Sequence, residues 1–359
     1  MGLESLVKVA YSGIRSVLSL AGGSIRDDYA QFFGIDSYHA WDGPFGYANT
    51  LDNLAYANPR RIEPFCEGKS TEGRPILAAK ISADVRYPRP FAFLFTGMIH
   101  AREFISGEAC LHIAQCLLQD YNDGDVTVRK ILDCAEVYVL PVLNPDSFVK
   151  NVDAVEASKH FGWLLRRNPR GVDLNRNFDD NFDGRAWTNK IPFSAPFNEE
   201  YAGSHAFSEA ESKAVRDFVL RRFPHIVAAM NFHSASNVVL YQPGSSMNTY
   251  AAQQGLARRI ADEIGYDAVQ LSHFLEYASG RFATRIRHPT VEGSLDGWLH
   301  QKCGVRSLLV EIGELNLPLL LASHLAGYNP PPKDMRLHTD KCYRAARRMM
   351  SDVLSIIGW

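Results

Sequence analysis

The stretch Thr96–Glu103 (TGMIHARE) decides the fold of this chain and the place of its chemistry. The apolar run Phe91–Phe95 before it predicts a buried strand, and apolar residues at helical spacing after it predict a helix over Gly107–Tyr121. His100 and Glu103 therefore lie on the turn where a strand gives way to a helix. Their spacing lets an imidazole and a carboxylate face one point, which suits two ligands of a zinc site. A surface salt contact is the alternative for this pair alone.

The composition is that of an ordinary globular protein with a large core. The chain has 359 residues, 46% of them hydrophobic, and a formal net charge of −2. A balance so close to neutral implies no bulk polyanion as a partner. Basic runs with interleaved aromatic residues do not occur, so nucleic acid is not expected as a partner.

Six cysteines are present, and none forms a Cys-x-x-Cys pair, which predicts buried free thiols and favours a reducing compartment. The segment Met1–Gly23 has apolar residues at helical intervals, but polar residues interrupt it. It predicts an amphipathic helix packed on the body, and neither a signal peptide nor a membrane span. We therefore expect a cytoplasmic location, with secretion by a non-standard route left open.

Strands alternate with helices along the chain, which indicates an α/β sheet covered by helices on both faces. The segment Asn144–Asp146 (NPD) predicts a turn, and residues 151–205, rich in Asn, Gly and Pro, predict a long irregular and functional loop. No repeat, low-complexity tract or linker suggests a second domain. Further helices are expected over Tyr47–Ala55, Ser208–Arg222, Tyr250–Ile264 and Asp334–Ile357, and further strands over Ile76–Ile81, Val137–Leu143, Ile226–Phe232 and Leu308–Ile312.

Five further stretches carry polar residues of chemical interest. They are Leu164–Asn168 (LLRRN), Gly171–Phe178 (GVDLNRNF), Asn231–Ser236 (NFHSAS), His288–Asp296 (HPTVEGSLD) and Leu308–Gly313 (LLVEIG). With the His-x-x-Glu pair, their order and spacing resemble the metallocarboxypeptidase family, the carboxypeptidase A type. The resemblance runs from about Tyr47 to the C-terminus. It implies a mixed, twisted, roughly eight-stranded sheet between helices. It also implies a catalytic domain over residues 46–359, after an N-terminal helix and irregular lead-in over residues 1–45.

By this resemblance, His100, Glu103 and His233 would bind one Zn²⁺ per chain. Two neutral imidazoles and one carboxylate leave the ion a net positive charge and an open position. Glu311 matches the general base of the family, which moves the proton of the attacking water. An unpaired Glu inside an apolar strand is otherwise hard to explain, because burying it costs several kcal/mol. Glu314, which follows Gly313, is the weaker candidate for the general base and is expected to be a solvated loop charge.

The resemblance also assigns groups that hold the substrate. Asn175 and Arg176 would bind a terminal carboxylate, which an Arg fork and an amide donor suit. Asp173 would accept a hydrogen bond from His100 and fix its tautomer. Arg166 would stabilise the oxyanion, with Arg167 as the alternative register.

Arg102 would add positive charge beside the site, as its family counterpart does. His288 stands where the family carries a Tyr that closes over the substrate, and this departure puts ordinary exopeptidase behaviour in question. A His there can still donate a hydrogen bond, and Tyr277 is a distant substitute. Leu295 aligns with the floor of the specificity pocket and favours an apolar or small side chain over Lys or Arg. A basic cluster just before His288 indicates either a solvated loop or extra substrate carboxylates, and it consists of Arg281, Arg285 and Arg287.

Together these features predict a zinc-dependent peptidase that hydrolyses the amide bond next to a C-terminal residue of a peptide with a free terminal carboxylate. The alternative within enzymes is an amidase or endopeptidase on cell-wall-type peptides with γ-glutamyl or diaminopimelyl linkages. A non-catalytic binding module and a small-molecule deacylase related to aspartoacylase are two further alternatives. The metal ligands, the base and the carboxylate-binding clamp of Asn175 and Arg176 are all present, which counts against a non-catalytic module. The length of the chain counts against the deacylase.

Overall fold

The computed structural model describes seven segments of the chain, and the expected helix within residues 1–45 lies outside them, as does most of the lead-in. The described segments are residues 38–43, 46–158, 164–182, 199–242, 247–273, 292–315 and 327–359.

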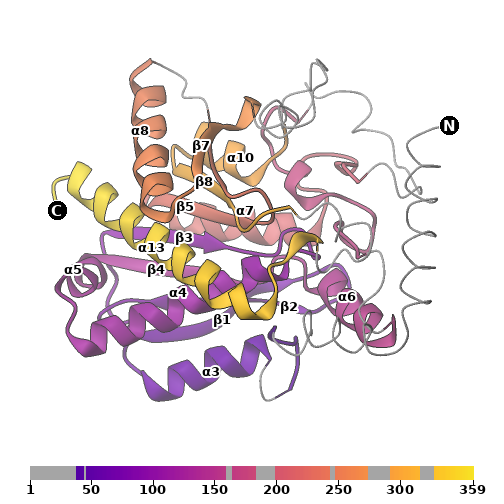
Figure 1. The fold of residues 1–359 in the computed structure, drawn as a ribbon, viewed down its shortest axis with the longest axis horizontal. Helices are drawn as coiled ribbons and strands as arrows, with labels where there is room; N and C mark the ends of the chain where they lie inside the picture. The colour runs from indigo at the N-terminus through magenta and orange to yellow at the C-terminus, as the bar shows by residue number, and fades with distance from the viewer. Residues whose placement is uncertain are drawn as a thin grey trace.

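An eight-stranded mixed sheet runs through the centre of the molecule (Figure 1), which confirms the predicted fold class. The strand order is β1-β2-β4-β3-β5-β8-β6-β7. The four central strands β4, β3, β5 and β8 are parallel to one another, whereas β1, β2 and β6 pair antiparallel to their inner neighbours. The strands are β1 Ile62–Lys69, β2 Pro75–Ile81, β3 Phe91–Thr96, β4 Ala135–Leu140, β5 Ile226–His233, β6 Val238–Tyr241, β7 Asp267–Gln270 and β8 Arg306–Glu311.

Helices cover both faces of the sheet, because alternate residues of each central strand point to opposite sides. In β3, Phe93 and Phe95 join the larger hydrophobic cluster with α4, α8 and α13, whereas Ala92 and Leu94 join the second cluster with α7 and α10. Figure 1 shows α8 and α13 on the near side of the sheet. The described α-helices are α3 Tyr47–Ala57, α4 Phe104–Asp123, α5 Val126–Cys134, α6 Pro145–Ser158, α7 Ala210–Arg222, α8 Met247–Ile264, α10 Leu295–Gln301 and α13 Pro332–Ile356.

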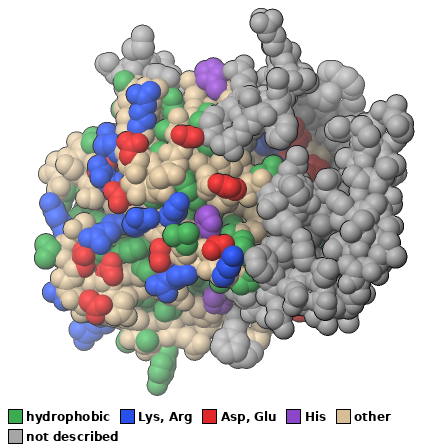
Figure 2. Space-filling model, viewed as in Figure 1, with side chains coloured by type: hydrophobic (Ala, Val, Ile, Leu, Met, Phe, Trp, Pro, Cys, Tyr) green, Lys and Arg blue, Asp and Glu red, His purple; other side chains and the backbone are tan. Residues whose placement is uncertain are grey.

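The outer face of α13 mixes charges of both signs. Figure 2 shows basic and acidic side chains interspersed on this side of the molecule. Among them, Arg348 pairs with Asp352 one helical turn on, and Arg259 of α8 reaches the same carboxylate. Within the described residues, no helix has the length and apolarity that a membrane crossing requires. All six cysteines are free thiols, as predicted, but their predicted burial is wrong for Cys66, which is exposed, and Cys116 is only partly buried.

The prediction of a turn and a long irregular loop after β4 is partly wrong. Instead of a turn at Asn144–Asp146, α6 begins at Pro145 and runs to Ser158, so the first residues of the predicted irregular segment 151–205 are helical. Proline fits the first helical position, because its fixed φ suits a helix and no partner for its missing N–H is needed there. Phe148 and Val155 then recur at helical spacing and are buried in the core.

Candidate active site

The predicted zinc ligands and the predicted base meet at one edge of the sheet. His100 and Glu103 follow the end of β3, and His233 is the last residue of β5. Glu311 is the last residue of β8. Because β3, β5 and β8 are neighbouring parallel strands, their carboxyl ends lie side by side, which is the usual place for a site in an α/β sheet.

The turn between β3 and α4 depends on a close approach of two backbone segments. A Cβ atom at Gly97 would lie 2.4 Å from the carbonyl oxygen of Ser106, so only glycine fits there. The Ser106 hydroxyl accepts a hydrogen bond from the amide of Met98 at 2.8 Å and fixes the turn. Glu103 precedes the first helical residue, but its side chain does not cap the helix. It is therefore free to face the two histidines.

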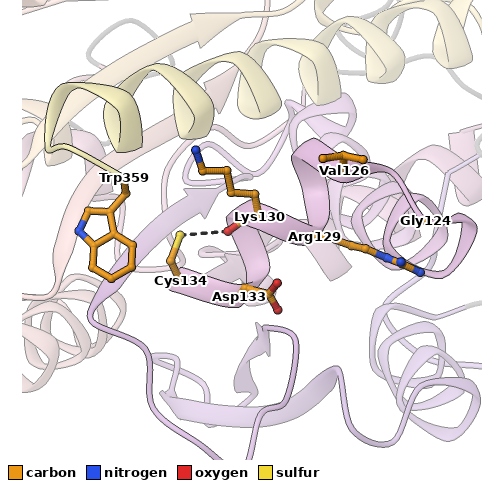
Figure 3. Close-up of a pocket in the computed structure, with 7 residues that line it drawn as sticks. All are labelled: Gly124, Val126, Arg129, Lys130, Asp133, Cys134 and Trp359. Atoms are coloured by element: carbon orange, nitrogen blue, oxygen red, sulfur yellow. Dashed lines mark hydrogen bonds between the residues drawn. The ribbon is translucent and has the colours of Figure 1, made fainter.

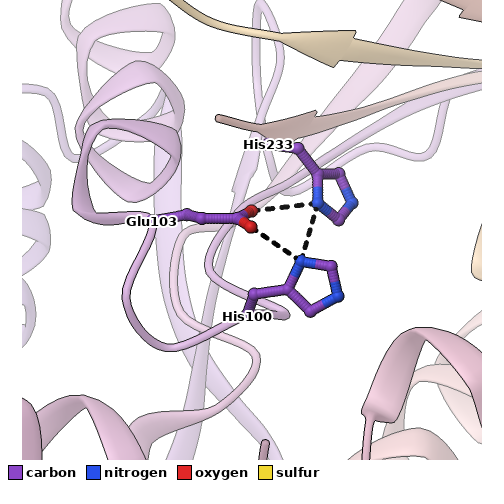
Figure 4. A group of neighbouring side chains, drawn as sticks. All are labelled: His100, Glu103 and His233. Carbon is purple, nitrogen blue, oxygen red and sulfur yellow. Dashed lines mark hydrogen bonds and ion pairs between the residues drawn. The ribbon is translucent and has the colours of Figure 1, made fainter. Parts of the chain in front are cut away.

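His100, Glu103 and His233 form a buried triad (Figure 4). The carboxylate of Glu103 lies 2.9 Å from Nδ1 of His100 and 3.0 Å from Nδ1 of His233. The two Nδ1 atoms are 3.1 Å apart. Burial by itself raises the pKa of Glu103, but the two imidazoles outweigh it and hold this pKa below the ordinary range.

The geometry of the triad fits a zinc ion. Ligand atoms about 2.1 Å from a tetrahedral Zn²⁺ lie about 3.4 Å from one another, and the three ligand atoms here all lie within 4.8 Å of each other. On the far side of its ring, Nε2 of His100 lies 3.2 Å from Oδ1 of Asp173. This contact places the ring proton on Nε2 and turns the lone pair of Nδ1 toward the triad. The donor set therefore matches a site with three protein ligands and an open position.

Asp173 connects His100 to Arg166. Its second oxygen, Oδ2, accepts hydrogen bonds from Nε and Nη2 of Arg166 at 3.1 and 2.9 Å. Burial raises the pKa of Asp173, but Arg166 and His100 more than offset it and hold the pKa well below its usual range. The third guanidinium nitrogen of Arg166, Nη1, lies 3.8 Å from Glu103. The structure thus brings Arg166 to the triad in the register that the sequence favoured.

Glu311 lies across from His233. The two residues are register partners on β5 and β8, and the amide of Ile312 donates to the carbonyl oxygen of His233 at 2.8 Å. Burial, with the charges of Glu103 and Asp296, raises the pKa of Glu311 to about 7 against the opposing effect of His233. A bound cation would oppose this rise through its own charge.

Asn175 and Arg176 lie in a short 3₁₀ turn, Leu174–Arg176, immediately after Asp173. The amide of Leu295 donates to Oδ1 of Asn175 at 2.9 Å, which fixes the orientation of the side-chain amide. No hydrogen bond from its Nδ2 group to another described residue is present.

The backbone of Arg176 is held by Gly293. A Cβ atom at position 293 would lie 2.2 Å from the carbonyl oxygen of Arg176, and the φ of Gly293 is +78°. On either side of this contact, the amide of Phe178 donates to Gly293 O at 3.0 Å and the amide of Gly293 donates to Asp180 O at 2.7 Å. Asn175 and Arg176, the predicted clamp for a substrate carboxylate, are therefore fixed to the segment that leads into α10.

Sequence reasoning missed three residues near the predicted substrate arginines. Arg102 donates from both terminal nitrogens to Glu199 at 2.8 Å, and its Nη2 donates to the hydroxyl of Tyr328 at 2.9 Å. Arg176 donates from Nη2 to Oε1 of Glu200 at 2.7 Å. The adjacent acids Glu199 and Glu200, within a segment predicted to be functional, were the one available signal.

The structure does not test two of the predicted substrate contacts, His288 and Leu295. His288 lies outside the described residues, as do Tyr277 and the basic cluster before His288. The Leu295 side chain is 1% exposed and packs in the second hydrophobic cluster with Phe178 and Trp298. Its role as the floor of a specificity pocket stays a prediction, whereas its backbone amide orients Asn175.

A surface hollow of about 470 Å³ lies at the other end of the strands (Figure 3). Trp359 lines it and packs edge-on against Phe91, the first residue of β3, with ring centroids 5.4 Å apart. The triad follows the last residue of the same strand, so the hollow is separate from the candidate site. The lining residues are Gly124, Val126, Arg129, Lys130, Asp133, Cys134 and Trp359.

A mixed sheet that presents two imidazoles and a carboxylate at its parallel strand ends, with a second carboxylate opposite, defines an α/β metallohydrolase. The family model for zinc carboxypeptidase matches residues 47–341. The chain therefore belongs to the zinc carboxypeptidase family. This confirms the family resemblance predicted from the sequence and the predicted class of enzyme, a metallopeptidase. Zinc is accordingly the metal that the family implies for the triad.

Curated relatives agree with this assignment. A zinc carboxypeptidase of Simulium vittatum is 30% identical over 259 residues, which cover 68% of this chain and 77% of the relative. Human carboxypeptidase B is 29% identical over 310 residues, which cover 84% of this chain and 69% of the relative. Bovine carboxypeptidase A1 is 30% identical over 273 residues, 74% of this chain and 60% of the relative. The chain thus spans about 60 to 77% of the length of these three relatives.

Solved structures share the fold. Bovine thrombin-activatable fibrinolysis inhibitor, in complex with tick carboxypeptidase inhibitor, has a TM-score of 0.69 at 21% identity. That match covers 89% of this chain and 98% of the other. Carboxypeptidase A from Helicoverpa armigera has a TM-score of 0.65 at 19% identity and covers 87% of this chain and 74% of its own. At these identities the likeness shows the common architecture.

Proposed function

We propose that this protein is a zinc-dependent carboxypeptidase, which hydrolyses the amide bond next to the C-terminal residue of a peptide. The observation that carries the proposal is the buried triad of His100, Glu103 and His233, with Glu311 directly opposite on the neighbouring strand. Family membership supports the same reaction.

We assign one Zn²⁺ per chain to this triad. When bound, the ion would polarise the scissile carbonyl and lower the pKa of a water molecule to near neutrality. His100 and His233 offer neutral nitrogen donors, and Glu103 supplies the one negative charge. Asp173 keeps His100 in the tautomer that can bind a metal.

Glu311 acts as the general base. Its carboxylate takes a proton from the attacking water and then delivers that proton to the leaving nitrogen of the substrate. Burial raises the pKa of Glu311 in the metal-free protein, and a bound cation would lower it again, which favours the ionised carboxylate that accepts the proton.

Arg166 stabilises the charge that develops on the carbonyl oxygen. Asp173 binds Nε and Nη2 of the guanidinium, so Arg166 is held in place before the reaction begins. Nη1 lies on the side of the triad, 3.8 Å from Glu103, and is the donor that can face the substrate oxygen. A fixed cation of this kind costs no reorganisation during the reaction.

Asn175 and Arg176 bind the terminal carboxylate of the peptide. Nδ2 of Asn175 is turned away from Leu295, because Oδ1 accepts the backbone amide of that residue. The guanidinium of Arg176 adds a planar, charged donor beside it. Together they select a substrate with a free C-terminus.

A second candidate is an amidase or endopeptidase on cell-wall-type peptides that uses the same base and ligands. The observation that favours it is that both predicted substrate arginines already pair with acids of the chain, Arg102 with Glu199 and Arg176 with Glu200. A clamp with its own counter-ions is less dependent on a terminal carboxylate.

One experiment separates these functions. The zinc-loaded protein is incubated with a mixed library of plain and γ-glutamyl peptides, with and without chelator, and the products are identified by mass spectrometry. Release of single C-terminal residues, abolished by chelator and by Glu311→Gln, supports a carboxypeptidase. Cleavage limited to γ-glutamyl or internal bonds supports the second candidate, and the absence of any zinc-dependent cleavage contradicts both.

A further inference from the structure

The guanidinium of Arg176 carries a counter-ion from its own chain. Nη2 of Arg176 lies 2.7 Å from Oε1 of Glu200. The Arg176 side chain is 9% exposed, whereas that of Glu200 is 47% exposed. The two partners of this ion pair therefore differ in how easily they can leave it, since only the glutamate is half in water.

Arg176 is the fixed partner. Its Nη1 donates to the carbonyl oxygen of Asn175 at 3.0 Å, and its own carbonyl packs against Gly293 without room for a Cβ atom. Glu200 contacts the arginine through a single oxygen. A carboxylate that enters from solvent could contact Arg176 and the amide of Asn175 together, which offers more hydrogen bonds than Glu200 makes.

We propose that Glu200 is a displaceable internal counter-carboxylate that determines specificity at the clamp. It neutralises Arg176 when no substrate is bound, and the terminal carboxylate of the substrate replaces it. This inference rests on the proposed clamp role of Arg176. Glu200 thereby lowers the affinity for every ligand with a free C-terminal carboxylate and leaves the affinity for neutral C-termini unchanged. The clamp then retains only carboxylates that also reach Asn175.

The neighbouring ion pair of Arg102 and Glu199 shows why we expect the carboxylate exchange at Arg176 and not at Arg102. Arg102 donates from both terminal nitrogens to Glu199, and its guanidinium lies 4.2 Å from the ring centre of Tyr328. A bidentate pair on an aromatic ring is held more strongly than a pair through one oxygen. Glu199 is accordingly a structural partner of Arg102, and Glu200 is the one that exchanges.

The test measures binding of a product-like acid. N-acetyl-L-phenylalanine and the uncharged N-acetyl-L-phenylalanine amide are titrated into the zinc-loaded protein by calorimetry. In the Glu200→Gln variant, the Kd of the acid should fall about two- to fivefold, the range that half-exposed ion pairs span. The Kd of the amide should not change, although a general distortion of the site would alter both.

Two further variants complete the test. Glu63→Gln removes the same charge from another exposed pair, with Lys80 on the outer strands, and should leave both Kd values unchanged. In an Arg176→Gln background, Glu200→Gln should lose its effect on the acid, because the competing contact no longer exists. Circular dichroism confirms that each variant is folded.

The outcomes separate the inference from the function on which it rests. If Arg176→Gln weakens binding of the acid but Glu200→Gln leaves it unchanged or weakens it, the exchange is refuted and the clamp stands. If Arg176→Gln binds the acid as tightly as the wild type, the clamp itself is wrong. A gain for the acid alone in Glu200→Gln, lost in the double variant, supports the exchange.

Discussion

His233 and Glu311 occupy matched positions on adjacent parallel strands, so the sheet itself sets the proposed metal ligand opposite the proposed general base. The hydrogen bond from the amide of Ile312 to the carbonyl oxygen of His233, at 2.8 Å, continues the ladder past them. A sheet holds such a pair more rigidly than two loops would, which favours catalysis by preorganised groups.

Replacing Glu311, the proposed general base, should abolish most activity and leave zinc binding unchanged. Glu311→Gln keeps the size of the side chain but cannot accept the proton, so kcat should fall at least about a hundredfold. Steady-state kinetics and the zinc content of the purified protein are measured together. Glu314→Gln, three residues on at an exposed position, is the matched control and should behave as the wild type. Equal losses in the two variants would contradict the assignment.

Asp173→Asn should weaken the metal site and slow the reaction at once. The amide cannot accept from His100 and Arg166 as the carboxylate does at 3.2 and 2.9 Å. Zinc affinity should fall about ten- to a hundredfold, the usual effect of removing such a partner. Competition with a metal-binding dye measures affinity, and kcat at saturating zinc measures the effect on Arg166. A variant with unchanged zinc affinity would show that Asp173 does not orient His100.

Asp180 should make the stability of the fold depend on pH. Burial, with the charges of Glu292 and Asp296, raises the pKa of Asp180 to about 6, above its unfolded value, although Ser294 donates to it. The folded state therefore binds more protons between pH 4 and pH 6, so stability falls as pH rises through this window. The contribution is about 2 to 3 kcal/mol at most.

The measurement is urea unfolding of the wild type and Asp180→Asn at pH 4.5 and at pH 7.5. Because asparagine has no charge to bury, the variant should gain stability relative to the wild type as pH rises. Asp179→Asn, at the neighbouring position with a side chain 52% exposed, is the control and should show no such trend. A difference between wild type and Asp180→Asn that is constant with pH would contradict the burial argument.

Gly293→Ala should damage the clamp as well as the fold. The added Cβ would meet the carbonyl oxygen of Arg176 at 2.2 Å, and the φ of +78° is itself unfavourable for alanine. Gly73→Ala isolates the second effect, since Gly73 has a φ of +89° with nothing within 4 Å. We expect Gly293→Ala to raise the KM for peptides with free C-termini, and Gly73→Ala to cost only stability, about 1 kcal/mol. Equal KM values for both variants would exclude the contact from substrate binding.

The strength of local patterns decided which elements the sequence could predict. The strand Phe91–Thr96 was predicted correctly, because its apolar run Phe91–Phe95 is uninterrupted and a glycine follows at position 97. The first strand, β1, was missed, since it is a partly exposed edge strand whose burial alternates weakly. The helix after β4 was missed because Asn144–Asp146 suits a turn and a helix start equally well.

The candidate site shows the same division. His100 and Glu103 are close in sequence, so their spacing was informative, whereas His233 and Glu311 required the resemblance to a family. The contacts of Glu199 and Glu200 with the arginines depend on the tertiary fold, and no local pattern encodes them. The role of His288, the location of the protein and the lead-in helix stay predictions.

The carboxylate of Asp173 contacts His100 through one oxygen and Arg166 through the other. The orientations of His100 and Arg166 are therefore coupled, because both depend on the position of one carboxylate. Any shift of the backbone at Asp173 would move the imidazole and the guanidinium together.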